Sequence, residues 1–338
     1  MTPRSTVRIL LATGVAALLA GCGSLLSAPS TSSNGQSAAS APQAGTAAAS
    51  PGPPYNVSGL LDPATGKYLG LEADGAPDSL TPVNTFAANI GRNPNMVGQY
   101  ISWGTPFDAS AAANAWSYGA LYYLAWEPFS SSVQAIADGQ SDAYITQFAR
   151  AVRTLNVPVA LSFGHEMNGN WYPWGTAKTT PATFVAAWRH IHDLFTKADA
   201  GNVIWVWNPN IINPVPGTQL KPLYPGDSYV DWVGVTGYFP TTGPQTYTTL
   251  FAPTMTEIRG FTAKPFIIAE TAIETGPAEV ACAENLIASV TGHSDVLGFV
   301  WFDIDKGGVD WRVESRPTVR AAMARDVATL KLVDPKRK

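Results

Sequence analysis

Residues 158–166 read PVALSFGHE, and residues 265–270 read PFIIAE. Each segment begins as a continuous apolar run and ends at a glutamate, which is Glu166 in the first and Glu270 in the second. A continuous apolar run is typical of a strand that is buried on both faces of a parallel sheet. The two segments therefore predict buried parallel strands, each with a carboxylate at its end.

Similar short runs recur on both sides of these segments and alternate with longer amphipathic stretches. The strand candidates are 68–72, 96–103, 120–126, 158–163, 203–207, 229–235, 265–269 and 296–302. Helical periodicity is clearest over 142–155, 181–197, 279–290 and 317–330. Eight strand–helix units predict an α/β fold, a (β/α)₈ TIM barrel in a single catalytic domain. An open doubly wound sheet is the alternative, but residues 70–75, GLEADG, lack its GxGxxG phosphate turn.

The amino terminus has the features of a targeting segment. Residues 1–21 contain two arginines followed by a short apolar run, which predicts a signal peptide. The run ends in LAGC, which resembles a bacterial lipobox and predicts lipidation at Cys22; an ordinary cleaved signal is the alternative. Residues 22–54 consist mostly of Ala, Ser, Gly and Pro, so we expect a flexible tether. The barrel is then expected over residues 55–338.

Composition excludes several classes of function. The chain has a net charge of −4 and no basic stripe, so we expect no nucleic-acid partner. Two cysteines are too few for a disulfide scaffold, and Cys282 is expected to be a buried apolar residue. His165-Glu166 does not begin a zinc-binding HExxH motif, because Gly169 stands where the second histidine is required. We expect neither a metal nor a cofactor.

The predicted strand ends are rich in aromatic, carboxylate and amide side chains. Active sites of TIM barrels lie at these carboxyl ends. The residues found there are Trp103, Trp126, Glu127, His165, Glu166, Asn208, Tyr238, Glu270 and Trp301. Aromatic rings stack on sugar faces while carboxylates and amides bind hydroxyls, so this row predicts a polysaccharide site.

Glu166 and Glu270 suit the cleavage of a glycosidic bond. That reaction needs one carboxyl group to protonate the leaving oxygen and a second to attack the anomeric carbon or activate water. The ends of strands four and seven lie on opposite sides of the opening of a barrel, so the Glu166 and Glu270 side chains are expected to face one gap. The alternative is that the two glutamates cap helices or pair with arginines.

Four segments resemble glycoside hydrolase family 26, the β-mannanase-like family of clan A. Residues 161–175, LSFGHEMNGNWYPWG, resemble its acid/base segment, and residues 265–271 resemble its nucleophile strand. Residues 224–234 are similar to its sixth-strand entry, and residues 300–303 with 310–312 to its last loop. The resemblance runs in order from about Tyr68 to Ala324 and implies a retaining hydrolase.

The resemblance also implies roles for single residues. Glu166 would be the general acid/base and Glu270 the nucleophile. Of the neighbouring residues, His165 would contact the sugar in the −1 subsite, Tyr238 would orient the nucleophile, and Trp171 and Trp301 would form cleft walls. A buried structural role for His165 stays open, as does a turn role for Asn168, which is otherwise a substrate-binding candidate.

The chain departs from the family pattern at two positions. Ser162 stands where many relatives have Arg, and Thr236 where many have Asp. These departures concern the recognition of the sugar rather than the class of reaction.

The leading hypothesis is a retaining, endo-acting β-glycosidase that cuts β-1,4-mannan or a related β-glycan. It would be held at the extracytoplasmic side of the cell envelope through its lipid anchor, or secreted. The alternative is a lipid-anchored carbohydrate-binding protein without turnover. The sequence does not determine the oligomeric state.

Overall fold

The computed structural model describes residues 52–62 and 66–336. Cys22, the predicted signal peptide and nearly all of the predicted tether lie outside the described residues. Eight parallel strands close into a barrel in the order β1 to β8, and β8 pairs with β1. The strands are β1 (Tyr68–Ala73), β2 (Met96–Ser102), β3 (Leu121–Glu127), β4 (Val159–Phe163), β5 (Val203–Trp207), β6 (Trp232–Thr236), β7 (Phe266–Thr271) and β8 (Val296–Asp303). The predicted (β/α)₈ barrel is confirmed.

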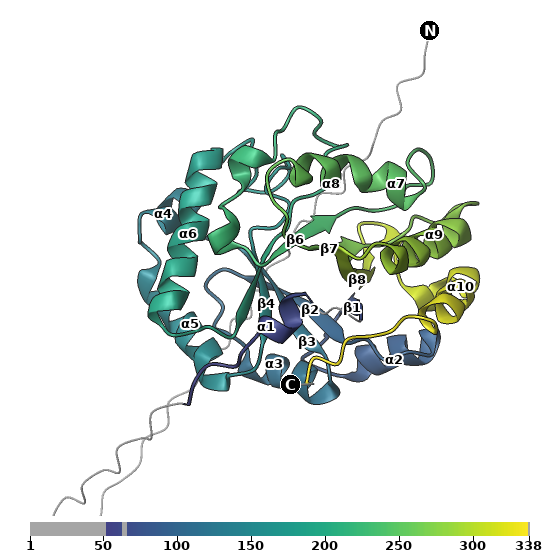
Figure 1. The fold of residues 1–338 in the computed structure, drawn as a ribbon, viewed down its shortest axis with the longest axis horizontal. Coiled ribbons are helices and arrows are strands. Elements are labelled where there is room, and N and C mark those ends of the chain that lie inside the picture. Colours follow the sequence, from purple (N-terminus) through teal and green to yellow (C-terminus); the bar gives the residue numbers. More distant parts are fainter. Residues whose placement is uncertain (1–51, 63–65, 337–338) are drawn as a thin grey trace, which may run out of the picture. The chain divides into compact units, whose positions relative to one another are not determined.

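Helices surround the barrel, except that the short helix Ser58–Leu61 lies across one end of it and packs against the interior cluster (Figure 1). They are α1 (Ser58–Leu61), α2 (Thr81–Ile90), α3 (Ala109–Tyr118), α4 (Val133–Ala137), α5 (Asp142–Leu155), α6 (Pro181–Lys197), α7 (Tyr247–Leu250), α8 (Ala252–Arg259), α9 (Glu279–Gly292) and α10 (Pro317–Val327). Two short 3₁₀ helices, η1 (Lys221–Leu223) and η2 (Asp227–Tyr229), stand between β5 and β6, and η3 (Val313–Ser315) follows β8. None of the described helices is long and apolar enough to cross a membrane.

Local sequence signals explain where the long helices begin and end. The Thr180 side chain accepts a hydrogen bond from the Thr183 amide, and Pro181 occupies the first turn of α6. Helix α5 ends at Leu155, and the residue that caps it, Asn156, adopts a left-handed conformation with φ 56°. Both helices bury an apolar stripe against the sheet.

The core has two layers because successive strand residues point to opposite faces. One apolar cluster fills the barrel interior and includes Tyr68, Met96, Leu121, Tyr123, Ala160, Ile204, Val206, Trp232, Ile267, Ala269, Leu297 and Val300. The larger cluster lies between the strands and the helices and contains Cys282, which is 1% exposed as predicted. The barrel is therefore packed at its centre, and chemistry is confined to its ends.

Strand boundaries differ from the predicted ones by up to three residues. The strand predicted from residue 229 begins at Trp232, because Tyr229 belongs to η2 and the next two residues connect η2 to the strand. At the other end, β7 continues through Thr271, so Glu270 lies inside the strand. This extension governs how Glu270 is aimed.

Candidate active site

Glu270 is buried and is held by two tyrosines. The Tyr238 hydroxyl donates a hydrogen bond to one carboxylate oxygen, and the Tyr100 hydroxyl donates to the other. The contact with Tyr238 agrees with the predicted position of that residue. Tyr100 was not predicted, although it lies two residues before the end of β2.

An irregularity in β7 turns Glu270 toward the centre of the barrel. Ile267 and Ala269 point into the barrel interior, so strict alternation would turn Glu270 outward. The pairing of β6 with β7 shifts register between Gly234 and Thr236, which accommodates one extra residue of β7. A bulge of this kind re-aims a side chain, and such bulges are common beside active sites.

Glu166 lies three residues after the end of β4 in a sharply turned loop. Its φ is 54°, a left-handed conformation that is uncommon outside glycine and that clusters at functional sites. Its amide donates to the Asn208 carbonyl at 2.7 Å. One carboxylate oxygen accepts from Trp171 Nε1 at 2.7 Å, and the other accepts from Asn210 Nδ2. The predicted Trp171 therefore lies against the candidate acid.

The two glutamates have different electrostatic surroundings. Burial, followed by the negative charge of Glu270, raises the pKa of Glu166 to about 8. Burial also raises the pKa of Glu270, but the hydrogen bonds from Tyr100 and Tyr238 and the charge of Lys306 lower it. Near neutral pH this arrangement favours a protonated Glu166 beside an ionised Glu270, the pairing that an acid and a nucleophile require.

His165 is buried and neutral. It is 2% exposed, and burial lowers the pKa of its imidazole to about 3. Its Nε2 lies 3.3 Å from the Tyr172 hydroxyl, and its ring centroid lies 5.7 Å from that of Tyr100. Its Nδ1 has no partner among the described residues. The predicted sugar contact of His165 stays a prediction.

Asn168 supports the acid rather than the substrate. It has no exposed surface, so the predicted substrate contact is wrong. Its amide group donates to the Asn210 carbonyl and accepts from the Asn210 amide, both at 2.8 Å. These two hydrogen bonds fix the backbone of Asn210, whose side chain donates to Glu166. The turn role left open for Asn168 is the one that the structure favours.

Trp126 and Trp103 stack on each other outside the barrel interior. Trp126 has no exposed surface, stacks on Phe148 of α5 at 4.4 Å, and donates to the Tyr144 hydroxyl at 3.0 Å. Trp103 is 7% exposed and stacks on Trp126 at 4.4 Å. Both belong to the layer between strands and helices, because alternation along β3 turns Trp126 away from Glu127. The predicted sugar contact of Trp126 is wrong, and that of Trp103 stays a prediction.

Replacing Trp126 with alanine is therefore expected to lower the free energy of unfolding by about 3–5 kcal/mol, because it removes a fully buried ring. Urea unfolding followed by circular dichroism measures this change, with Trp126→Phe as the milder control. A Trp126→Ala protein of unchanged stability but higher KM for a glycan would contradict the structural role and support a sugar contact for Trp126.

Trp301 is also turned outward, for a different reason. It has no exposed surface and donates to the Trp311 carbonyl at 3.3 Å. Leu297 and Val300 both point into the barrel, three residues apart, so β8 breaks strict alternation before Trp301. The ring centroid of Trp311 lies 4.9 Å from that of Tyr238, which donates to Glu270. The prediction of Trp301 as a cleft wall is wrong, and no role was predicted for Trp311, although it lies in a segment that resembles the family.

The two departures from the family pattern lie near the acid. Thr236 donates to Asn208 Oδ1 at 3.3 Å, and the Asn208 carbonyl accepts from the Glu166 amide. Ser162 has no exposed surface and lies in β4. At position 236, where many relatives are expected to carry the charged residue Asp, this chain thus has a neutral hydrogen bond from Thr236 to Asn208.

A hairpin after β8 brings a cation to the carboxylates. It consists of β9 (Asp305–Lys306) and β10 (Val309–Asp310). Lys306 Nζ lies 5.9 Å from the centroid of the Tyr100 ring, and its charge lowers the pKa of Glu72, Glu127, Glu166 and Glu270. Neither Lys306 nor Glu72 was predicted. Within the described residues, no group of His, Cys, Asp and Glu side chains is arranged to hold a metal.

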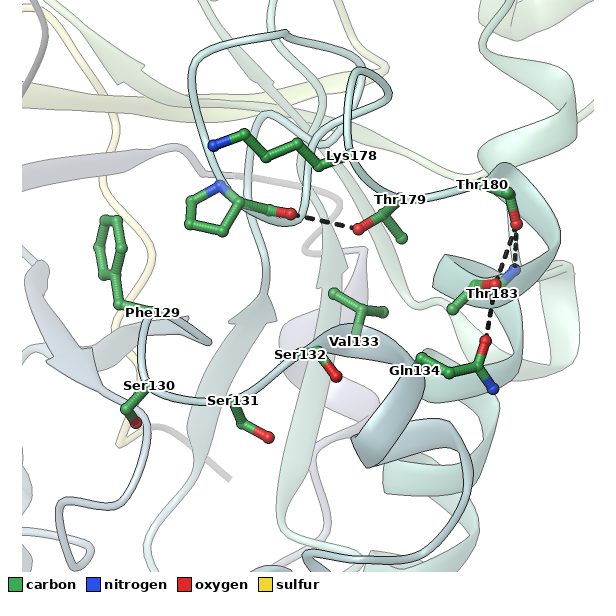
Figure 2. A pocket seen from close by; sticks show the side chains of 11 residues that line it. Phe129, Ser130, Ser131, Ser132, Val133, Gln134, Lys178, Thr179, Thr180 and Thr183 are labelled. Carbon is green, nitrogen blue, oxygen red and sulfur yellow. Dashed lines mark hydrogen bonds between the residues drawn. The ribbon is translucent and has the colours of Figure 1, made fainter.

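A separate cavity of about 570 Å³ lies between the loop after β3 and the start of α6 (Figure 2). Its lining includes Phe129, which is 45% exposed and packs edge-on against Trp174 at 4.8 Å. Figure 2 shows Thr180, Thr183 and Gln134 joined by hydrogen bonds along one wall. This cavity contains none of the carboxylates described above, so it is not the candidate catalytic centre.

Comparison with known proteins gives consistent matches. The model of "Glycosyl hydrolase family 26" matches residues 130–283. Endoglucanase H of Acetivibrio thermocellus is 34% identical over 262 residues, which are 73% of this chain and 29% of that protein. A β-1,3-xylanase, TXYA, of a Vibrio species is 26% identical over 198 residues, covering 55% of this chain and 41% of the relative. The chain thus spans less than half the length of these relatives.

Solved structures share the fold. The mannanase man26 of Bacillus subtilis aligns with a TM-score of 0.60 at 17% identity, covering 83% of this chain and 90% of that one. A GH26 β-mannanase from Bacteroides ovatus aligns with a TM-score of 0.57 at 15% identity, covering 82% and 93%. At these identities the similarity concerns the fold alone.

Proposed function

The chain belongs to glycosyl hydrolase family 26, and from that premise we propose that it is a retaining, endo-acting β-glycosidase that hydrolyses β-1,4-mannan or a related β-glycan. Glu270 would be the nucleophile and Glu166 the general acid/base. The observation that carries the proposal is the pair of buried glutamates with opposed surroundings. Glu270 accepts two phenol hydrogen bonds, whereas Glu166 lies in surroundings that favour its protonated form.

The geometry suits a double displacement. In the first step, Glu270 attacks the anomeric carbon, the glycosidic bond breaks, and the Glu166 proton passes to the leaving oxygen. In the second step, ionised Glu166 takes a proton from water, the hydroxide attacks the same carbon, and the bond to Glu270 breaks. Tyr238 and Trp171 would hold the two carboxyl groups in place through their hydrogen bonds.

The sugar is the finer part of the proposal. The relatives are named an endoglucanase, a β-1,3-xylanase and, in Bifidobacterium adolescentis, a mannan endo-1,4-β-mannosidase at 26% identity over 57% of this chain and 20% of that protein. The resemblance of residues 161–175 to a β-mannanase-like segment favours mannan.

Reducing-end release from mannan, xylan and mixed-linkage β-glucan tests this choice. Fastest release from mannan supports it, and fastest release from another β-glycan would replace the substrate while keeping the reaction. Binding to a glycan without release from any of them would favour the alternative, a carbohydrate-binding protein without turnover.

The pH dependence follows from the two pKa shifts. Glu166 must hold its proton, so kcat/KM is expected to fall as pH rises through about 8. Glu270 must be ionised, and burial raises its pKa above the ordinary value of 4.5. The acidic limb of the kcat/KM profile is therefore expected to lie at a pH above 4.5. A profile of kcat/KM between about pH 4 and pH 10 measures both limbs. An alkaline limb near the ordinary glutamate pKa would contradict the assignment of Glu166.

We further propose attachment to the cell envelope through a lipid on Cys22. The support is the LAGC sequence at residues 19–22. Detergent-phase partitioning of the full chain produced in a bacterial host tests it. The wild type is expected in the detergent phase and Cys22→Ser in the aqueous phase; equal partitioning of the two proteins would remove the anchor.

A further inference from the structure

Tyr100 places one phenol between two carboxyl groups. Its hydroxyl lies 2.8 Å from Glu72 Oε2 and also contacts Glu270 Oε2. A phenol carries a single proton, so it donates fully to only one of these oxygens. If both glutamates were ionised, the other contact would press a negatively charged oxygen against the phenol oxygen. The arrangement therefore calls for one additional proton in the group of three side chains.

Glu72 is the side chain best suited to hold that proton. It points inward from β1, is 1% exposed, and its Oε1 has no partner among the described residues. Gly98 on β2 makes room for it, because a Cβ there would lie 2.5 Å from Glu72 Cγ. This close packing excludes solvent from the Glu72 carboxyl group.

Charge favours the same location for the proton. Burial first, and then the negative charge of Glu270, raise the pKa of Glu72 well above its ordinary value. Glu270 accepts a hydrogen bond from Tyr238 in addition to its contact with Tyr100, whereas Tyr100 is the one hydrogen-bond partner of Glu72 among the described residues. The charged and titratable groups that face Glu72 are Glu270, Glu127, Lys306, Tyr100, Tyr123, Tyr172 and Tyr238. Lys306 is the one cation in this set, and it is exposed and shared with three other glutamates.

We propose that Glu72 is a positioning residue: its carboxylic acid donates a hydrogen bond to the Tyr100 oxygen and thereby directs the single phenol proton at Glu270. This inference rests on the proposed role of Glu270 as nucleophile. A phenol whose oxygen accepts a hydrogen bond is a stronger donor, so the chain from Glu72 through Tyr100 holds Glu270 ionised and aimed. It does so without placing a second negative charge beside the nucleophile.

Infrared spectroscopy tests the protonation state without turnover. Protonated Glu166 contributes a carboxylic acid band to both proteins at pH 7, so the expected result is an additional carboxylic acid band in the difference spectrum of the wild type minus Glu72→Gln. Glu284→Gln, which carries the same substitution on the surface of α9, is the control and is expected to keep the band. A difference spectrum in which Glu72→Gln loses only ionised carboxylate absorption would overturn the proposal.

Kinetics test the positioning role. Glu72→Leu removes the donor, so kcat/KM on an aryl β-glycoside is expected to fall about tenfold and the acidic limb to move up by about half to one pH unit. Glu72→Gln keeps an N–H donor and is expected to restore most of that loss and to leave the acidic limb in place. A downward move of the limb in Glu72→Gln would show that an anion had been removed, and an unchanged Glu72→Leu protein would show that no positioning occurs. Either outcome would overturn the inference.

Different results would contradict the proposed glycosidase function and the positioning role of Glu72. Absence of glycan hydrolysis by the wild type would remove the proposed function but leave the infrared result standing. Normal hydrolysis with an ionised Glu72 would remove only the positioning role.

Discussion

Glu270→Ala is expected to lower kcat/KM on the preferred β-glycan by about 1,000-fold or more. The substitution removes the atom that attacks the anomeric carbon, and the loss of a covalent nucleophile is among the largest single-residue effects on catalysis. The cavity left behind is bordered by the hydroxyls of Tyr100 and Tyr238, so a small anion has donors to bind there. Reducing-end release by the purified variant and the wild type measures the loss.

Azide distinguishes a missing nucleophile from a damaged fold. With an activated aryl β-glycoside, azide is expected to restore turnover of Glu270→Ala and to give the α-glycosyl azide, because the anion attacks from the face where Glu270 stood. Glu284→Ala, an exposed change on α9, is the matched control and is expected to behave as the wild type. Turnover of Glu270→Ala equal to that of the wild type would remove the nucleophile assignment.

Glu166→Ala is expected to show a loss that depends on the leaving group. On a glycan, whose leaving oxygen needs a proton, kcat/KM is expected to fall about 100- to 10,000-fold. On an aryl glycoside with an activated leaving group, formation of the glycosyl-enzyme needs little protonation, and kcat/KM is expected to fall less than about tenfold. Steady-state kinetics on a series of aryl glycosides of increasing leaving-group pKa measures the slope.

The slope also separates chemistry from positioning. The Glu166 carboxylate is held by Trp171 and Asn210, so its removal could also disturb the cleft. Asn168→Ala, which loosens Asn210 but keeps the carboxylate, is expected to weaken activity with a shallower dependence on the leaving group. Equal losses on glycan and activated aryl substrates in Glu166→Ala would contradict its role as the acid.

Strand positions could be predicted from the sequence because burial on both faces of a parallel sheet requires continuous apolar runs. The two runs that end at Glu166 and Glu270 are β4 and β7 of the observed barrel. Strand ends were less predictable. Helix η2 displaced the start of β6, since a short 3₁₀ turn leaves no periodic signal in the sequence.

The direction of each side chain was the weakest part of the prediction. A residue at a strand end points inward or outward according to parity, and bulges reverse parity without a clear sequence signal. Trp301 is outward because β8 breaks alternation between Leu297 and Val300, and Glu270 is aimed at the cleft by an irregularity in β7. Gly298 marks the break in β8, since a Cβ there would lie 2.0 Å from the Tyr68 carbonyl oxygen.

Residues that act through a neighbour were missed for a related reason. Asn210 and Tyr100 are 44 and 170 residues from the carboxylates that they contact, so only the closed barrel brings them together. Asn168 was noticed, but its partner is the Asn210 backbone and not a sugar. Family membership, by contrast, could be predicted from the long segment around Glu166, and the family match confirms it.

The stereochemistry of the first-formed product tests most directly whether Glu166 and Glu270 act on one anomeric centre. Proton NMR of a β-glycan digest, recorded before mutarotation, is expected to show the β-anomer at the new reducing end, because two successive inversions retain configuration. Appearance of the α-anomer first would show a single displacement by water and would contradict the assignment of Glu270 as a covalent nucleophile.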